Sequence, residues 1–165
     1  MKHLYLFVLL ITAVLGGCSE GRYDCTPESI TGHITEGKQI IVEYDTTYKR
    51  NNYFIKDGNN SVFEYKHAGA QCDNTADDEL LKILAFEVDK NATQFRFEGN
   101  EITTSNGFYQ QSGTWTSGNY EIKSGQIEGK KISESKWQVT VSVLASPIFP
   151  NREPIKIAFE QLFEK

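Results

Sequence analysis

The sequence of 165 residues lacks the patterns on which most enzymes, nucleotide-binding proteins and metal sites depend. It contains no G-x-S-x-G nucleophile elbow, no glycine-rich phosphate loop, and no cysteine with a second ligand at C-x-x-C or C-x-x-H spacing. His33 and His67 belong to no recognisable metal or triad motif. We therefore expect a non-enzymatic protein without catalytic residues, metal ligands or cofactors, although the sequence leaves open whether paired carboxylates meet in space.

Long apolar runs and an excess of basic residues are also missing. The longest apolar run, Leu4–Leu15, has 12 residues and is too short to cross a bilayer as a helix. Lys and Arg number 17 against 22 Asp and Glu, which gives a net charge of −5 at pH 7. Because the charges are interspersed and the balance is acidic, we expect no nucleic-acid partner and no electrostatic attraction to anionic lipid.

The apolar run follows a short basic start and leads to a cysteine through two small residues. This segment, Leu15-Gly16-Gly17-Cys18, resembles the lipobox of bacterial lipoproteins. The resemblance implies that residues 1–17 are a cleaved signal peptide and that acyl chains, palmitate among them, anchor the Cys18 thiol in the membrane. The alternative is an ordinary secretory signal followed by an unrelated cysteine.

The lipoprotein resemblance also implies a location and a domain organisation. Ser19 is not the aspartate that retains lipoproteins in the inner membrane of enteric bacteria, so we expect the outer membrane of the cell envelope. The mature chain would have 148 residues, the length of one domain. We divide it into a short lipid-anchored tether, residues 18–24, and a single domain, residues 25–165.

If Cys18 carries the lipid, the two remaining cysteines form an even pair in an oxidising compartment. We therefore predict a disulfide between Cys25 and Cys72. It would close a loop of 48 residues, for which the chain-entropy model gives about 4 kcal/mol of stabilisation. The alternative is a pair of unlinked, buried thiols.

The rest of the sequence alternates between apolar and polar residues in short runs separated by turn residues. The clearest run is Trp137–Leu144, in which every second residue is apolar. Turn signals recur about every ten residues, a spacing typical of sandwiches and barrels. We predict an all-β fold, an antiparallel meander forming a small barrel or β-sandwich with at most one short helix. That helix is expected near Ala76–Leu81, and the apolar segment Lys38–Tyr44 is expected to be buried on both faces.

Gly113-Thr114-Trp115 resembles the G-x-W signature of lipocalin-like barrels, although in that family the motif lies on the first strand. The leader and the β-rich body together are similar to small lipocalin-like envelope lipoproteins. This resemblance implies an apolar pocket, for which Trp115, Tyr120 and Trp137 are the candidate ligand-binding residues. The alternative is that the aromatic side chains simply fill the core, which 148 residues of sheet require for stability.

These observations lead to three functional hypotheses. The first is a lipid-anchored cell-envelope protein that binds a small apolar ligand in a lipocalin-like barrel. The second is an interaction or envelope-assembly module that binds an envelope protein through a sheet face or edge. The third is a hydrolase of envelope material. An internal cavity would favour the first hypothesis, and a filled core with an exposed apolar surface would favour the second.

Overall fold

The computed structural model describes residues 24–73, 75, 79–113, 117–148 and 152–165. The predicted signal peptide, the predicted lipidation site Cys18 and the predicted ligand-binding residue Trp115 lie outside the described residues. Residues 76–78 of the helical turn expected near Ala76–Leu81 lie outside them too, and Leu81 is the first residue of a strand. Within the described part of the chain, no helix is long and apolar enough to cross a membrane.

The described chain consists almost entirely of strands. In chain order, these are β1 Cys25–Thr26, β2 Ser29–Asp45, β3 Arg50–Ala68, β4 Gln71–Cys72, β5 Leu81–Asp89, β6 Gln94–Glu98, the 3₁₀ helix η1 Gly99–Ser105, β7 Phe108–Ser112, β8 Gly118–Ser133, β9 Lys136–Pro147 and β10 Ile155–Glu164. The predicted all-β class with one short helix is confirmed. The short helix of the described residues lies between β6 and β7.

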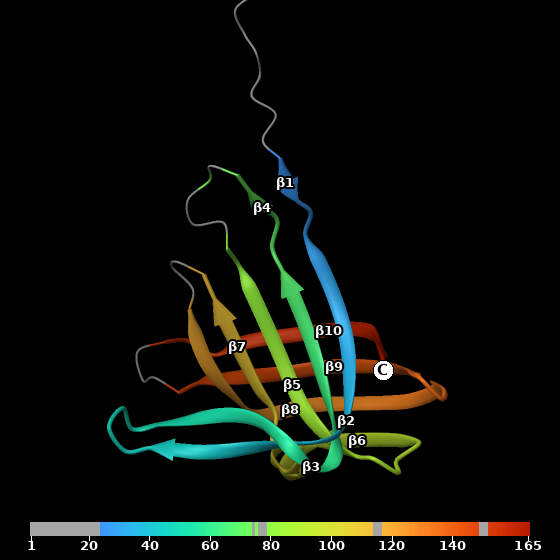
Figure 1. The fold of residues 1–165 in the computed structure, drawn as a ribbon. Helices are drawn as coiled ribbons and strands as arrows, with labels where there is room; N and C mark the ends of the chain where they lie inside the picture. The colour runs from blue at the N-terminus through green and yellow to red at the C-terminus, as the bar shows by residue number, and fades with distance from the viewer. Residues whose placement is uncertain (1–23, 74, 76–78, 114–116, 149–151) are drawn as a thin grey trace, which may run out of the picture.

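The main sheet contains eight strands in the order β6-β8-β7-β5-β3-β2-β10-β9, and a further pairing of β8 with β9 closes it in a ring. Apart from β6 and the pair of β2 with β10, neighbouring strands of the sheet follow one another along the chain, as in a meander. All pairings are antiparallel except that of β10 with β2, a single parallel pair between Glu164 and His33. In Figure 1, β2, β3, β5 and β7 run steeply, and β8, β9 and β10 cross them, so the barrel-like ring is flattened into two layers.

Side chains that point into the ring form one aromatic core. On β9, the inward residues Trp137, Val139, Val141 and Val143 are at most 5% exposed, as the alternation predicts. At the centre, the Phe63 ring lies with its centroid 5.3 to 5.6 Å from those of four other rings. These rings belong to Phe86, Phe95, Trp137 and Phe163. Close packing of this kind gives the interior the density of a filled core.

The far half of the β2–β3 hairpin, residues 38–57, leaves the ring after a bulge at Gly37 and packs on the outer face of β5 and β7; we call it the arm. Ile40 is buried there, and its backbone N–H donates to the buried Glu87 carboxylate. Val42 and Tyr44, in contrast, are 43% and 62% exposed. The expectation that Lys38–Tyr44 is buried on both faces is therefore wrong. Only the base of the arm, at Ile40, is buried against the body, and Val42 and Tyr44, on the same side of β2, lie further out along the arm.

The predicted disulfide is present. Cys25 and Cys72 are opposite each other in a separate two-stranded ladder of β1 and β4, with an S–S distance of 2.03 Å. This ladder lies at the end of the molecule where β2 and β3 rise beyond the crossing strands (Figure 1). The disulfide thus ties the start of the described chain to the end of the β2–β3 hairpin.

Candidate functional site

The structure places two of the three predicted ligand-binding residues, Tyr120 and Trp137, in the core. They are 3% and 5% exposed. Tyr120 lies opposite Pro147 at one end of β9, whereas Trp137 lies near the other end. Trp137 and Pro147 are ten positions apart, which is roughly 30 Å along a strand. The two aromatic side chains are therefore at opposite ends of the layer and do not face one small pocket.

The neighbouring strands β9 and β10 differ clearly in how far their inward-facing side chains are buried. On β9, the inward residues Val139, Val141 and Val143 are 0 to 2% exposed. On β10, the inward residues Ile155, Ile157 and Phe159 contact the same core but are only partly buried. The cause is the missing neighbour: β2 pairs with β10 only at Glu164, and no other strand of the described chain pairs with the outer edge of β10.

The crossing of β2 over β10 depends on Gly32. A Cβ atom at this position would lie 2.6 Å from the Leu162 carbonyl oxygen and 2.9 Å from the Phe163 ring, so no larger residue fits without movement. Beyond the crossing, β2 rises away from β10 (Figure 1). Ile30, two residues before Gly32 and on the same face of β2, is 48% exposed. The crossing therefore leaves an uncovered wedge between the two strands.

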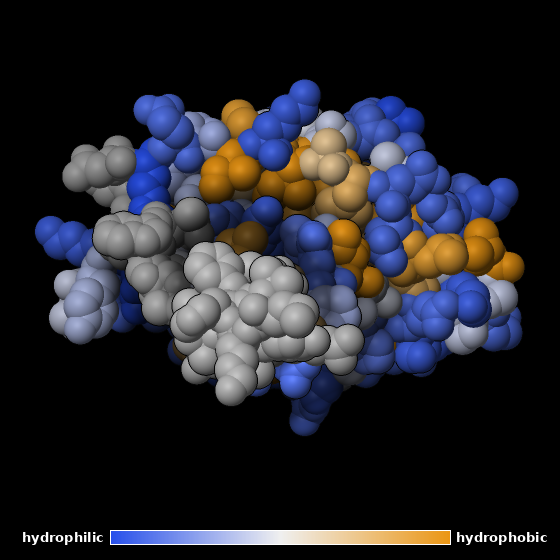
Figure 2. All heavy atoms as spheres, turned by 90° about the horizontal axis from the view of Figure 1, so that it is seen from above, coloured by the Kyte–Doolittle hydropathy of each residue, from blue (hydrophilic) through white to orange (hydrophobic). Residues whose placement is uncertain are grey.

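We call this wedge the β10 edge surface; it consists of the unpaired edge of β10 with Ile30, Tyr65, Ile155, Ile157 and Phe159. The Tyr65 and Phe159 rings stack at 4.0 Å between centroids. Seen from above, hydrophobic side chains reach the surface between polar ones (Figure 2). The surface therefore combines exposed apolar area with free backbone hydrogen-bonding groups, which are the two requirements for pairing with another strand.

Polar groups lie next to the β10 edge surface. The Tyr109 hydroxyl donates to the Gln111 side-chain oxygen over 2.7 Å. Burial, together with the nearby Tyr120 and Tyr65, raises the pKa of Tyr109 to about 12. Tyr109 thus keeps its proton at neutral pH and acts as a hydrogen-bond donor rather than as an acid or a base.

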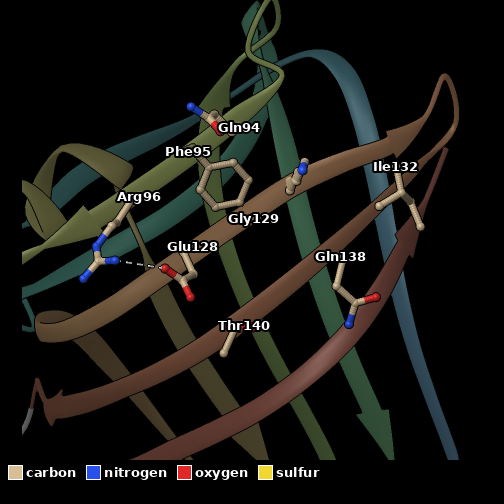
Figure 3. Close-up of a pocket in the computed structure, with 9 residues that line it drawn as sticks. Gln94, Phe95, Arg96, Glu128, Gly129, Ile132, Gln138 and Thr140 are labelled. Atoms are coloured by element: carbon tan, nitrogen blue, oxygen red, sulfur yellow. Dashed lines mark hydrogen bonds and ion pairs between the residues drawn. The ribbon is translucent and has the colours of Figure 1, made fainter.

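A second concave region is a groove of about 740 Å³ on the outer face of β6, β8 and β9. Figure 3 shows the side chains that line it, which come from all three strands. The lining residues are Gln94, Phe95, Arg96, Glu128, Gly129, Lys130, Ile132, Gln138 and Thr140. The Arg96 guanidinium donates to Glu98 over 2.7 and 3.0 Å and reaches Glu128 at 3.4 Å. The groove therefore carries charged and amide groups beside the apolar Phe95 and Ile132, whereas the side chains of the β10 edge surface are apolar or aromatic.

Neither region was singled out by the sequence reasoning. The alternation of Ile155, Ile157 and Phe159 indicates a strand but does not indicate how many neighbours that strand has. Among the described residues, no three His, Cys, Asp or Glu side chains come together as a metal site. The chain matches no known family model, and no curated protein or solved structure is significantly similar to it.

Proposed function

We propose that the protein is a lipid-anchored, non-enzymatic module of the cell envelope that binds an extended strand of a partner protein along the free edge of β10. One observation carries the proposal: the inward row is buried on β9 and partly exposed on β10. The filled core around Phe63 favours this hypothesis over a small apolar ligand inside the ring. In strand addition, backbone hydrogen bonds supply affinity and alternate side chains supply specificity.

The length of the edge suits a strand. Residues 155–162 of β10 have no strand neighbour on their outer side within the described chain, a length of about 26 Å. Proteins commonly protect such edges with proline, bulges or inward-pointing charges. The inward positions of β10 carry Ile155, Ile157 and Phe159 instead. An added strand would cover these side chains with every second residue of its own.

Lipid anchoring and the envelope location rest on the leader and on the disulfide. The order of residues from Leu15 to Cys18 supports acylation of Cys18, and the Cys25–Cys72 disulfide supports an oxidising compartment. Labelling of growing cells with an alkyne fatty acid tests the anchor directly. The wild-type protein should be labelled and the Cys18→Ser variant should not; equal labelling of both would contradict the anchor.

Site-specific photo-crosslinking of the full-length protein in its membrane tests the strand-addition proposal. A benzophenone side chain at position 157 points into the β10 edge surface, and the same side chain at position 158 points to the opposite face of the strand. We expect crosslinks from position 157 to one protein segment with apolar residues at alternate positions. Equal products from both positions, or none from position 157, would overturn the proposal.

A pair of lysine substitutions provides a matched second test. Ile157→Lys places a charge on the inward side of the free edge, whereas Ala158→Lys places the same charge on the outward side. The first substitution should abolish the crosslinked complex, here probed from position 155, and the second should leave it intact. Thermal unfolding of both variants distinguishes lost binding from lost folding. Retained binding in a folded Ile157→Lys protein would contradict strand addition.

A further inference from the structure

The groove on the outer face is built from two rows of side chains that cross three strands in register. Gln94, Lys130 and Gln138 form the first row. Arg96, Glu128 and Thr140 form the second row. Side chains directly opposite on antiparallel strands have Cβ atoms about 5 Å apart, so each row is a continuous line of polar groups. Hydrogen-bond donors and acceptors therefore alternate across the whole groove.

Several of these groups have no partner within the described chain. Lys130 forms no ion pair there, and neither the Gln94 amide nor the Thr140 hydroxyl forms a side-chain hydrogen bond. Gln138 donates its amide to Glu160 over 2.8 Å, which leaves its carbonyl oxygen available. Arg96, in contrast, is already engaged by acidic side chains. The groove thus offers one free cation among several uncommitted neutral polar groups.

This combination limits the chemistry of a ligand. Ile132 is the main exposed apolar residue of the lining, so an apolar ligand would leave the polar rows without partners. A phosphate group carries up to two charges and is commonly held by several cations, whereas here a single free ammonium, that of Lys130, stands on the same face of β8 as Glu128, two residues away. A ligand with one negative charge and many hydroxyl groups matches the Lys130 ammonium and the uncommitted neutral groups better than a phosphate does. A volume of about 740 Å³ accommodates more than a single small ring.

We propose that this groove binds an acidic oligosaccharide, with a sugar carboxylate on Lys130 and sugar hydroxyl groups on Gln94, Gln138 and Thr140. This site is separate from the β10 edge surface, since it lies on the outer face of β6, β8 and β9. Gly129 allows the Phe95 ring to lie against the β8 backbone beneath the groove, because a Cβ atom at this position would overlap that ring. The binding therefore adds a glycan contact to the proposed strand contact.

Calorimetric titration of the full-length protein in detergent with trigalacturonate tests this inference, with maltotriose as the neutral trisaccharide. We expect trigalacturonate to bind about 10-fold or more tightly than maltotriose, since one charge-assisted hydrogen bond is gained. Lys130→Met should remove that preference. Lys156→Met, which removes an exposed lysine on the outward side of β10, should keep it.

Three outcomes would overturn the inference. The first is equal binding of the acidic and neutral trisaccharides, and the second is the same effect of Lys130→Met and Lys156→Met. The third is competition by sodium acetate at the concentration of the trisaccharide, which would show that the groove recognises any carboxylate and no sugar. Loss of trigalacturonate binding in Thr140→Val, with unchanged thermal unfolding, would further support contact with a sugar hydroxyl.

Discussion

Replacing Phe163 by alanine tests whether the ring is filled, which is the observation that separates a strand-binding module from a container for a ligand. The side chain is fully buried, and its ring centroid lies 5.6 Å from that of Phe63 and 6.3 Å from that of Phe86. Removing such a side chain from a packed core costs about 3–5 kcal/mol. A domain of this size has a total stability of about 5–15 kcal/mol, so the variant should lose a large fraction of it.

Urea unfolding of the mature chain, followed by the fluorescence of Trp137, measures this loss, because the indole ring packs against Phe63 at 5.4 Å. Phe159→Ala is the matched control, since Phe159 lies on the same strand and face but is only partly buried. We expect the control to lose clearly less stability. If Phe163→Ala costs under about 1 kcal/mol, the interior is not close-packed, and an apolar ligand inside the ring becomes the better hypothesis. Native mass spectrometry of the wild type should show the disulfide-bonded chain without a bound molecule.

Three further predictions concern the disulfide, pH and the strand crossing. Changing Cys25 and Cys72 to serine should lower the free energy of unfolding by about 4 kcal/mol, measured in urea; a loss under about 1 kcal/mol would contradict the loop-entropy argument. The pKa of Tyr109 is raised in the folded state, so its contribution to stability is present below about pH 10 and is lost as the pH rises toward about 12. Tyr109→Phe should reduce this alkaline loss in urea unfolding at stepped pH, and identical pH profiles would refute the assignment. Gly32→Ala places a Cβ atom 2.6 Å from the Leu162 carbonyl oxygen, so it should cost about 1–3 kcal/mol and speed amide exchange at the end of β10, whereas unchanged exchange would show that the crossing tolerates the methyl group.

The alternation of apolar and polar residues was sufficient to predict most of the strands and their faces. Trp137–Leu144 has the predicted inward and outward sides because each side of β9 meets a different environment. The ring closure was not predictable in the same way. It depends on one parallel pair and on the close approach at Gly32, and neither produces a periodic pattern in the sequence.

Two segments show where local patterns gave the wrong environment. The apolar residues of Lys38–Tyr44 predict burial on both faces, but the bulge at Gly37 turns the arm outward, and only its base at Ile40 is buried against the body. The 3₁₀ helix Gly99–Ser105 lies where the sequence analysis expects no helix. That helix ends at Asn106, which adopts a left-handed conformation with φ of 48°. Short helices of this kind carry no apolar period long enough to recognise.

Local sequence patterns also do not locate the candidate sites. Within a strand, the alternation of apolar and polar residues indicates which side chains point inward. Tyr120 and Trp137 point inward as it predicts. Alternation does not show whether the inward side chains leave a cavity, because that depends on the volumes of residues brought together from distant strands. An unpaired edge is equally invisible in sequence, since β9 and β10 alternate alike and differ only in the number of strands beside them.

If Cys18 is acylated, the tether restricts where a partner strand can bind. Seven residues separate Cys18 from Cys25, and an extended chain of that length spans about 25 Å at most. Cys25 belongs to the ladder at the end where β2 rises above β10, while the arm lies at the other end (Figure 1). The wedge beside β10 would then open toward the bilayer, and the exposed Tyr44 and Tyr48 of the hairpin would be remote from it. A partner strand must therefore come from a protein segment close to the membrane surface. If the partner is itself anchored in that membrane, a spacer of about 20 residues inserted after Ser19 should weaken the crosslink from position 157.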